Sequence, residues 1–462
     1  RCTGCKTCEL ACKDFKDLGP EVSFRRIYEY AGGDWQEDNG VWHQNVFAYY
    51  LSISCNHCDD PACTKVCPSG AMHKREDGFV VVDEDVCIGC RYCHMACPYG
   101  APQYNAEKGH MTKCDGCYSR VAEGKQPICV ESCPLRALEF GPIEELRQKH
   151  GTLAAVAPLP RGHLTKPLVI WLIRRKCKMG NGWHEWPLVI FTVLGQCVVG
   201  ALIVSGIGWF AAKNDADRQR IVRGMFFLWL LMGVGFIASV MHLGSPLRAF
   251  NSLNRIGASG LSNEIAAGSI FFAVGGLWWL VAVIGKMPQA LGKLWLLVSM
   301  ALGVIFVWMM TCVYQIDTVP TWHNGYTTLA FFLTVLLSGP ILAAAILRAA
   351  RVTFNTTPFA IISVLALIAC AGVIVLQGLS LASIHSSVQQ ASALVPDYAS
   401  LQVWRVVLLC AGLGCWLCPL IRRREPHVAG LVLGLILILG GEMIGRVLFY
   451  GLHMTVGMAI AG

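Results

Sequence analysis

Hydrophobic and polar positions follow two different patterns along the chain, and the change falls near residue 179. Beyond that point, long apolar runs alternate with short polar connections. Each run is long enough to cross the roughly 30 Å hydrocarbon layer of a membrane. The runs are residues 186–212, 221–243, 263–285, 290–314, 326–350, 358–382, 401–421 and 427–450. We therefore expect an all-α bundle of eight transmembrane helices.

The first part of the chain, residues 1–166, has a different pattern. Segments 46–54 and 79–82 have the composition of strands and lie between short helical stretches, which predicts a small α+β domain. An apolar run, LVIWLI, and the basic sequence RRKCK then precede Met179. We interpret residues 167–178 as a junction between two parts that are otherwise separate subunits, the second being 179–462. Arg1 directly precedes the first cysteine, so we expect the natural N-terminus to lie upstream.

Composition and charge support this division. Of the 462 residues, 54% are hydrophobic and 15% are charged, which excludes a disordered or purely soluble chain. Residues 1–178 carry 23 Lys and Arg against 22 Asp and Glu, whereas residues 179–462 carry 15 against 8. The basic excess lies in short loops between apolar spans. It therefore reports membrane topology and does not indicate a nucleic-acid partner.

The basic residues of the loops predict the orientation of the bundle. The odd-numbered connections, together with the ends of the runs beside them, hold eleven Lys and Arg, whereas the even-numbered connections hold only Arg248 and Arg255. Cytoplasmic loops are the basic ones, so both ends of the bundle are expected outside. We expect a multi-pass protein of the bacterial inner membrane with the first domain on its outer, periplasmic face. Such a location requires export in folded form, carried by a partner with a twin-arginine signal.

Sixteen of the 23 cysteines form four groups within the first 133 residues. The groups are Cys2, Cys5, Cys8 and Cys12; Cys55, Cys58, Cys63 and Cys67; Cys87, Cys90, Cys93 and Cys97; and Cys114, Cys117, Cys129 and Cys133. The first and third have the C-x2-C-x2-C-x3-C spacing of bacterial ferredoxins, in which the fourth cysteine ligates the other cluster. A zinc array or a disulfide framework is the alternative, but repeated triplets ending in Cys-Pro favour iron–sulfur clusters. Sixteen thiolates predict four 4Fe-4S clusters.

The fold class expected is thus an α+β ferredoxin-like four-cluster domain followed by an all-α eight-helix transmembrane bundle. Cations near the cysteines, among them Lys65, Arg91 and Lys113, are candidates for raising cluster potentials by stabilising the reduced form. The alternative for each is an ordinary solvated surface charge.

Ionisable residues at or inside the apolar runs are costly and indicate function. Those at the outer ends, where we expect them to converge on one site, are His242, Arg248, Glu264, Arg405, Glu442 and Arg446. Quinol oxidation needs a proton acceptor beside each ring oxygen and an electron acceptor nearby. We predict that His242 is that base and that Glu264 is its partner or proton exit.

Structural alternatives remain open for these residues. Glu264 suits a helix N-terminus, His242 suits an interfacial hydrogen bond, and Glu442 with Arg446 suits an ion pair four residues apart. Haem b would need paired axial histidines within the membrane. The histidines that lie near helix ends instead are His242, His323, His385 and His453, so we expect no haem.

The motifs resemble a known family. RCTGCKTCELACK, CNHCDDPACTKVCPSGAMHK, CIGCRYCHMACPYGAPQY and CDGCYSRVAEGKQPICVESCP resemble the iron–sulfur subunit of bacterial dimethyl sulfoxide reductases. GNGWHEWPLVIFT, HLGSPLRAFNSLNRIGASGLSNEIAAGSIFFAVGG, IHSSVQQASALVPDY and FYGLHMTVGM resemble the membrane anchor of the same enzymes, whose two subunits are separate chains.

The resemblance implies an electron route from a haem-free, eight-helix menaquinol-oxidising anchor, through four clusters, to a molybdopterin-containing catalytic subunit. It implies that group one pairs with group four and group two with group three, and that Cys90 completes four 4Fe-4S clusters. His242 and Glu264 match the quinol-site residues.

We thus expect the electron-transfer and anchor component of an anaerobic S-oxide or N-oxide reductase, drawing on the menaquinone pool and holding no molybdopterin itself. An equivalent component of a polysulfide, thiosulfate or tetrathionate reductase is the first alternative. A non-catalytic anchor and assembly scaffold is the second.

Overall fold

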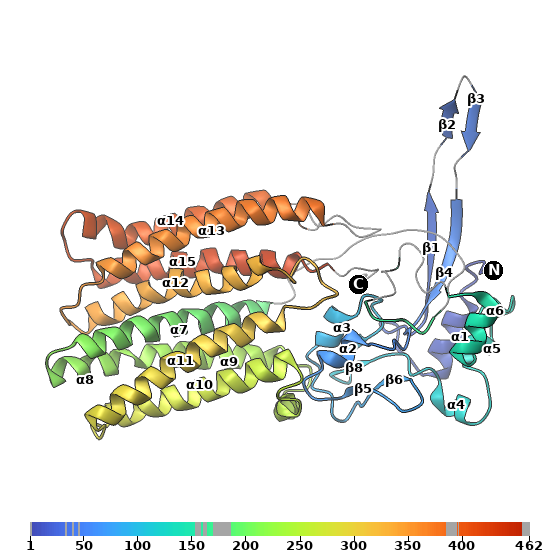
Figure 1. Ribbon diagram of the computed structural model, residues 1–462, viewed down its shortest axis with the longest axis horizontal. Helices are drawn as coiled ribbons and strands as arrows, with labels where there is room; N and C mark the ends of the chain where they lie inside the picture. Colours follow the sequence, from blue (N-terminus) through green and yellow to red (C-terminus); the bar gives the residue numbers. More distant parts are fainter. Residues whose placement is uncertain are drawn as a thin grey trace.

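The computed structural model describes residues 2–32, 35–38, 41–44, 47–152, 159, 164–169, 186–384, 395 and 397–454. It consists of a small domain at one end of a long helical bundle (Figure 1). Most of the predicted junction, residues 170–178, lies outside the described residues, as do Met179 and His385.

The small domain is made of short helices and antiparallel hairpins. Its helices are α1 (Thr7–Phe15), α2 (Ala62–Lys65), α3 (Tyr92–Ala96), α4 (Tyr118–Ala122), α5 (Ile128–Glu131) and α6 (Ile143–His150). The strands pair as β1 (Arg26–Gly32) with β4 (Phe47–Ile53), β2 (Trp35–Asp38) with β3 (Val41–Gln44), β5 (Met72–Lys74) with β6 (Val80–Val82), and β7 (Gln103–Asn105) with β8 (His110–Thr112). The predicted α+β class and the two predicted strands are confirmed, since β4 and β6 fall within segments 46–54 and 79–82.

The core of this domain includes many of its own cysteines. Cys63, Cys67, Cys87 and Cys93 pack with Met72, Val80 and Met111 in one buried cluster. In a domain of this size, burial of apolar side chains contributes only limited stability to the fold. Metal ligation adds further stability in such small domains. The position of the cysteines in the core therefore couples the fold to the cofactor.

The bundle contains eight helices, in the described residues, that are long and apolar enough to span a membrane. They are α7 (Trp186–Ala211), α8 with α9 (Asp215–Gly224 and Phe226–Met241), α10 (Gly260–Val283), α11 (Gln289–Val313), α12 (Gly325–Ala349), α13 (Thr357–Ser383), α14 (Tyr398–Ile421) and α15 (Val428–Gly451). The predicted eight spans are confirmed. The second begins earlier than predicted and has a break between Gly224 and Phe226, and a 3₁₀ helix, η2 (Pro246–Leu253), follows it.

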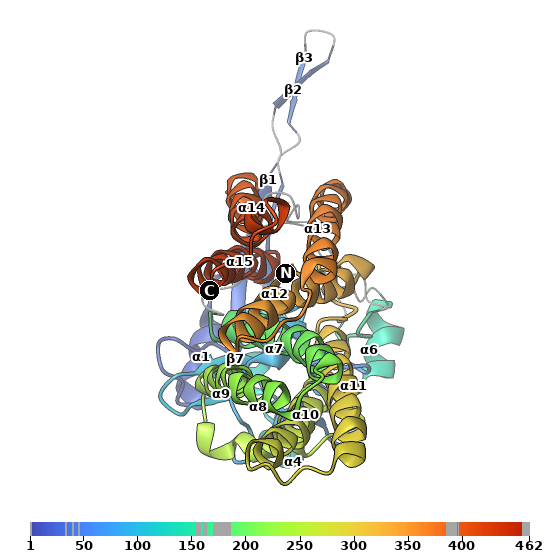
Figure 2. The same ribbon diagram turned by 90° about the vertical axis from the view of Figure 1, so that its left-hand side faces the viewer.

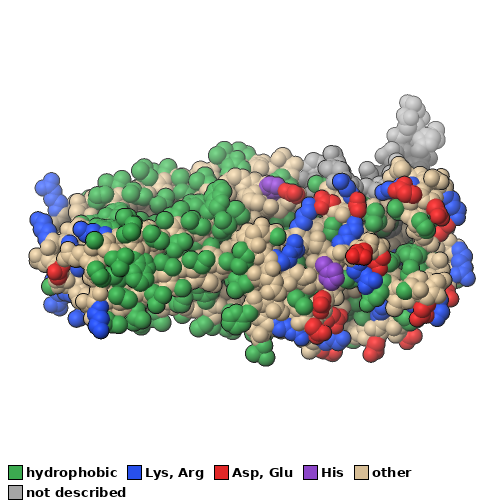
Figure 3. Space-filling model, turned by 60° about the horizontal axis from the view of Figure 1, so that its bottom comes forward, with side chains coloured by type: hydrophobic (Ala, Val, Ile, Leu, Met, Phe, Trp, Pro, Cys, Tyr) green, Lys and Arg blue, Asp and Glu red, His purple; other side chains and the backbone are tan. Residues whose placement is uncertain are grey.

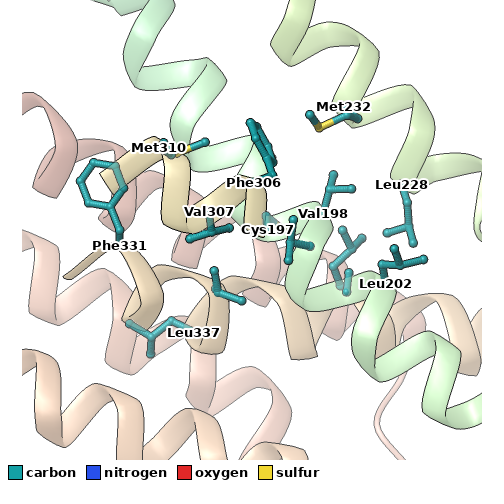
Figure 4. Packing of buried hydrophobic residues seen from close by; sticks show 14 of the residues in the cluster. Cys197, Val198, Leu202, Leu228, Met232, Phe306, Val307, Met310, Phe331 and Leu337 are labelled. Carbon is teal, nitrogen blue, oxygen red and sulfur yellow. The ribbon is translucent and has the colours of Figure 1, made fainter. Parts of the chain in front are cut away.

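Two helices form the interior of the bundle. In the most apolar 18-residue stretch of α7 and of α12, 83% and 78% of the residues are buried. The same share is only 28% in α10, α13 and α14. Figure 2 shows the bundle end-on, and Figure 4 shows the packing of Cys197, Val198 and Leu202 of α7 among residues of α9, α11 and α12. The outer helices expose large hydrophobic side chains, which form the apolar belt of Figure 3. Such a belt is what a lipid-facing surface requires.

The small domain docks on one end of the bundle, opposite the end where Lys and Arg side chains gather in Figure 3. Ser245 donates its backbone N–H to Ile88 O (3.2 Å), and the hydroxyls of Ser262 and Thr318 donate to Pro68 O (3.0 Å) and Ala96 O (2.8 Å). His453 lies 2.9 Å from Met95 O through its Nε2. The loops carrying Ser245 and Thr318 are the even-numbered ones, so the predicted relation between the domain and these loops agrees with the structure.

Candidate functional site

The sixteen cysteines gather into four sets of four, and each set joins the first three cysteines of one sequence group to the last cysteine of another. Site A is Cys2, Cys5, Cys8 and Cys133; site B is Cys12, Cys114, Cys117 and Cys129; site C is Cys55, Cys58, Cys63 and Cys97; site D is Cys67, Cys87, Cys90 and Cys93. The grouping matches the pairing that the family resemblance implied.

The local backbone is suited to holding a cluster. In each group the residue before the second cysteine, Gly4, His57, Gly89 or Gly116, has a left-handed conformation with φ between 42° and 77°. This turn directs amide N–H groups at sulfur: Gly89 N donates to Cys87 Sγ and Gly116 N donates to Cys114 Sγ (both 3.4 Å). Hydrogen bonds of this kind stabilise a thiolate, which is the form that ligates iron.

The thiols themselves also point to metal ligation. Burial raises the pKa of the Cys90 and Cys114 thiols to about 12, so charge on their sulfurs has to be stabilised by a metal. In the part of the chain that the structure describes, no three His, Cys, Asp or Glu side chains are close enough to hold one bare metal ion. Four thiols around a shared space, spaced too widely for a single ion, fit a 4Fe-4S cubane. When bound, such a cluster accepts and passes on one electron.

The four sites follow one another through the domain. Cys93 of site D is in electrostatic contact with Cys63 of site C, and Cys55 of site C with Cys114 of site B. Site A is linked to site B through Cys8 and Cys129. Site D lies against the bundle, because Gly244 donates its N–H to Gly89 O (3.4 Å) beside Cys90. The arrangement is a line from the membrane to the far side of the domain.

Three cations next to this line differ sharply. Lys65 is exposed and paired with Asp60 at 2.7 Å, which is the solvated alternative expected for it. Lys113 is 3% exposed. Burial lowers the pKa of Lys113, but thiolates at Cys55, Cys114 and Cys63 more than compensate and raise it. Arg25 was missed in the sequence analysis, because it stands outside every cysteine motif; its guanidinium donates to Ser52 Oγ (2.9 Å).

His242 and Glu264 both lie where the bundle meets site D. His242 follows the last turn of α9, and it interacts with the backbone of Cys90. Burial lowers the pKa of His242 to about 4, with a further contribution from the charge of Arg91, so its imidazole is neutral at physiological pH. Glu264, in the first turns of α10, is 3% exposed, and its Oε1 has no hydrogen-bond partner in the described part of the protein. An orphaned buried oxygen of this kind calls for a ligand or a water.

Three tyrosines complete this region; Tyr92 and Tyr450 lie within the motifs quoted above, but nothing in the sequence singled out any of the three. Glu264 is close enough to Tyr92 of α3 and to Tyr314 to interact with both electrostatically. The hydroxyl of Tyr314 is 2.6 Å from that of Tyr450, at the end of α15. Tyr92 adjoins the site D ligand Cys93, so the tyrosines link the membrane end of the site to the cluster domain.

Arg248 does not belong to this region. It lies on η2, where its guanidinium contacts Glu84 O and lies 3.6 Å from Asp85. The structure thus places Arg248 at a contact between the two domains, and its role at a quinol site stays a prediction.

The remaining three predicted residues line a cavity of their own, and Arg446 also interacts electrostatically with Tyr314 and Tyr450, so this cavity adjoins the region of Glu264. Arg405, Glu442 and Arg446 line a cavity between α12, α13, α14 and α15 together with Thr334, Gln402 and Tyr398. Glu442 pairs with Arg405 (3.2 Å) and not with Arg446, which donates to Gln196 (2.8 Å) and stacks 3.7 Å from the ring centroid of Phe331. The ion pair expected within α15 is instead formed between α14 and α15.

Four ferredoxin-type cysteine sites that lead to buried acid–base groups of a membrane bundle define a membrane-anchored iron–sulfur electron-transfer protein. A family model described as the DMSO reductase anchor subunit (DmsC) matches residues 179–452, more than half of the chain, and the chain belongs to this family. A model described as a 4Fe-4S dicluster domain matches residues 46–143.

Individual relatives match one half of the chain each. The anaerobic dimethyl sulfoxide reductase chain YnfH of Escherichia coli is 99% identical over 284 residues, covering 62% of this chain and 100% of the relative. The probable anaerobic dimethyl sulfoxide reductase chain YnfG of the same organism is 97% identical over 170 residues, 37% of this chain and 83% of the relative. A third relative, from the anaerobic dimethyl sulfoxide reductase of Haemophilus influenzae, is 45% identical over 290 residues, 62% of this chain and 100% of the relative.

Proposed function

We propose that this chain oxidises menaquinol where the bundle meets site D and passes the electrons through four 4Fe-4S clusters to a molybdopterin-containing subunit that reduces an S-oxide or N-oxide. The observation that carries the proposal is the position of Glu264 and His242 directly against the segment holding Cys90, Tyr92 and Cys93. The relatives are named as chains of anaerobic dimethyl sulfoxide reductases, which supports the substrate class.

The buried groups provide what quinol oxidation requires. A quinol releases two electrons and two protons, so each ring oxygen needs a proton acceptor. The neutral His242 ring accepts one proton, and the carboxylate of Glu264, which lies near Tyr92 and Tyr314, accepts the other. The paired hydroxyls of Tyr314 and Tyr450 extend this hydrogen-bonding region away from site D. Electrons leave singly through site D, because that is the site in contact with the bundle.

The far end of the line suits a protein partner. Large apolar side chains near site A are unusually exposed, with Leu10 70%, Leu135 50% and Phe15 43% accessible. Leu135 also lines the space among the site A cysteines. Exposed apolar patches of this kind mark protein interfaces, so the catalytic subunit is proposed to dock here.

The domain is proposed to lie on the periplasmic face. Its support is the docking of the domain on the bundle end that is opposite the basic loops, which the positive-inside rule places in the cytoplasm. On this arrangement, protons from quinol leave on the side where substrate reduction consumes them.

The test of the quinol site is single-turnover reduction of the clusters in membrane vesicles by a reduced short-chain naphthoquinol, followed by electron paramagnetic resonance (EPR). Glu264→Gln and His242→Ala are each expected to slow reduction about 100-fold or more, the scale of a lost general base. Dithionite should still reduce the clusters fully. Glu425→Gln and His323→Ala serve as controls, because both side chains are exposed and paired elsewhere. Wild-type rates in Glu264→Gln and His242→Ala would show that the site is wrong.

The terminal substrate is tested separately. Membranes from cells that also express the catalytic partner are supplied with quinol and with dimethyl sulfoxide, polysulfide or tetrathionate. Preferential oxidation of quinol by the sulfoxide is expected. Preference for a sulfur compound would retain the electron route and replace the substrate class.

A further inference from the structure

Lys113 occupies an unusual position between two of the cysteine sites. It directly precedes Cys114 of site B and is 3% exposed. Its ammonium donates to Val80 O and to Cys114 O, the latter at 2.6 Å, and it interacts electrostatically with Cys55 of site C. One buried positive charge thus lies beside ligands of two consecutive sites.

The charge of Lys113 has no carboxylate counter-charge in the described residues, where the Lys–carboxylate pairs are those of other lysines. A buried ammonium is costly unless an opposite charge and hydrogen bonds compensate for it. Among the described residues, the anions beside it are the cysteine sulfurs of sites B and C once they ligate iron. The two carbonyls satisfy two of its three N–H groups and hold it in place.

A fixed cation of this kind acts on electron transfer. A cluster that gains an electron gains a negative charge, and a nearby positive charge in a low-dielectric interior stabilises that reduced state strongly. Because Lys113 contacts sites B and C alike, it favours reduction at both. The effect is electrostatic and needs no change in the protonation of Lys113.

We propose that Lys113 is a positioning residue that raises the reduction potentials of the clusters at sites B and C together, and so draws electrons away from the membrane-facing site D. This inference rests on the proposed function, since it requires clusters at sites B and C.

The test is an EPR redox titration of the whole chain in membranes, with iron content measured on the same samples. Lys113→Gln removes the charge and keeps a hydrogen-bond donor, Lys113→Met removes both, and Lys113→Arg keeps the charge. Lys65→Met is the matched control, because Lys65 follows the site C ligand Cys63 by two residues yet is exposed and paired with Asp60.

In Lys113→Gln and Lys113→Met, two of the four cluster signals are expected to become harder to reduce. At a fixed potential their ratio of reduced to oxidised form should fall at least tenfold, which corresponds to 59 mV for a one-electron couple. The other two signals, all four in Lys113→Arg, and all four in Lys65→Met should stay at wild-type values.

Each other outcome decides against the proposal. Four wild-type potentials in a fully loaded Lys113→Gln protein would show that the charge is without redox effect. Loss of clusters in both neutral variants but not in Lys113→Arg would assign the charge to assembly. Absence of about sixteen iron atoms from the wild-type protein would instead defeat the proposed function, so the two failures are distinguishable.

Discussion

The two halves of the molecule bury charged groups in different ways. In the small domain, the buried cation Lys113 and the half-buried Arg25 lie beside cysteine sulfurs of neighbouring sites. Short loops with left-handed turns position the cysteines of each site. In the bundle, long regular helices isolate a few polar residues, and Arg405 finds its partner Glu442 on a different helix. Function in the first half depends on local sequence, whereas in the second half it depends on packing between distant segments.

The largest effect is expected from a substitution at the contact between the two halves, near site D. Gly89 has φ +70°, and a Cβ there would lie 2.4 Å from Gly109 O and 2.9 Å from Gly244 Cα. Gly89→Ala is therefore expected to push site D away from the bundle and to reduce quinol-driven cluster reduction by about 100-fold or more, as a displacement of about 1 Å does elsewhere. Stopped-flow measurement of cluster bleaching by naphthoquinol checks this.

The control for Gly89→Ala is Gly78→Ala. Gly78 also has a positive φ, +87°, but nothing lies within 4 Å of a Cβ there. It carries the same backbone strain, roughly 1 kcal/mol, without the clash. Equal loss of quinol-driven reduction in both variants would show that strain, and not the contact with the bundle, is responsible.

What the sequence predicts well differs between the halves for the same reason. Cysteine spacing is local, so the sixteen cysteines that the structure gathers into sites A to D could be identified, although spacing alone did not separate buried Lys113 from exposed Lys65. Hydrophobic runs located the eight spans to within a few residues, except for the start of the second. The interactions of Glu264 with Tyr92 and Tyr314 could not be predicted, because these residues come from three separate elements and no local spacing relates them.

The buried pair in the bundle predicts a large effect on stability. Arg405→Met leaves Glu442 without its cation in a cavity, which is expected to destabilise the fold by about 3–5 kcal/mol. Adding Glu442→Gln should recover most of that loss. Thermal unfolding of the detergent-solubilised protein measures both. Arg348→Met at the exposed pair with Glu425 is the reference, where a change of about 1 kcal/mol or less is expected; an equal loss there would contradict the special status of the buried pair.

The close packing of α7 on α12 gives a second test of how strongly the bundle depends on contacts between distant segments. A Cβ on Gly339 would lie 2.4 Å from Gly200 Cα, so the two helices touch through their backbones. Gly339→Ala is expected to cost about 1–3 kcal/mol through overpacking. Gly378→Ala, at a glycine of α13 with open space around it, should be neutral or slightly stabilising because alanine favours helix. Thermal unfolding in the same detergent compares the two, and identical midpoints would refute the close contact.

The smallest effect concerns the hydroxyl pair of Tyr314 and Tyr450, whose oxygens are 2.6 Å apart. Tyr314→Phe leaves the Tyr450 hydroxyl without this partner and is expected to cost about 1 kcal/mol of stability, the net value of a typical hydrogen bond. A double-mutant cycle with Tyr450→Phe isolates that coupling. If the pair belongs to the quinol region, each variant should also slow naphthoquinol-driven cluster reduction several-fold while leaving dithionite reduction unchanged. Coupling in stability without any change in rate would make the pair part of the packing between α11 and α15, and confine proton chemistry to Glu264 and His242.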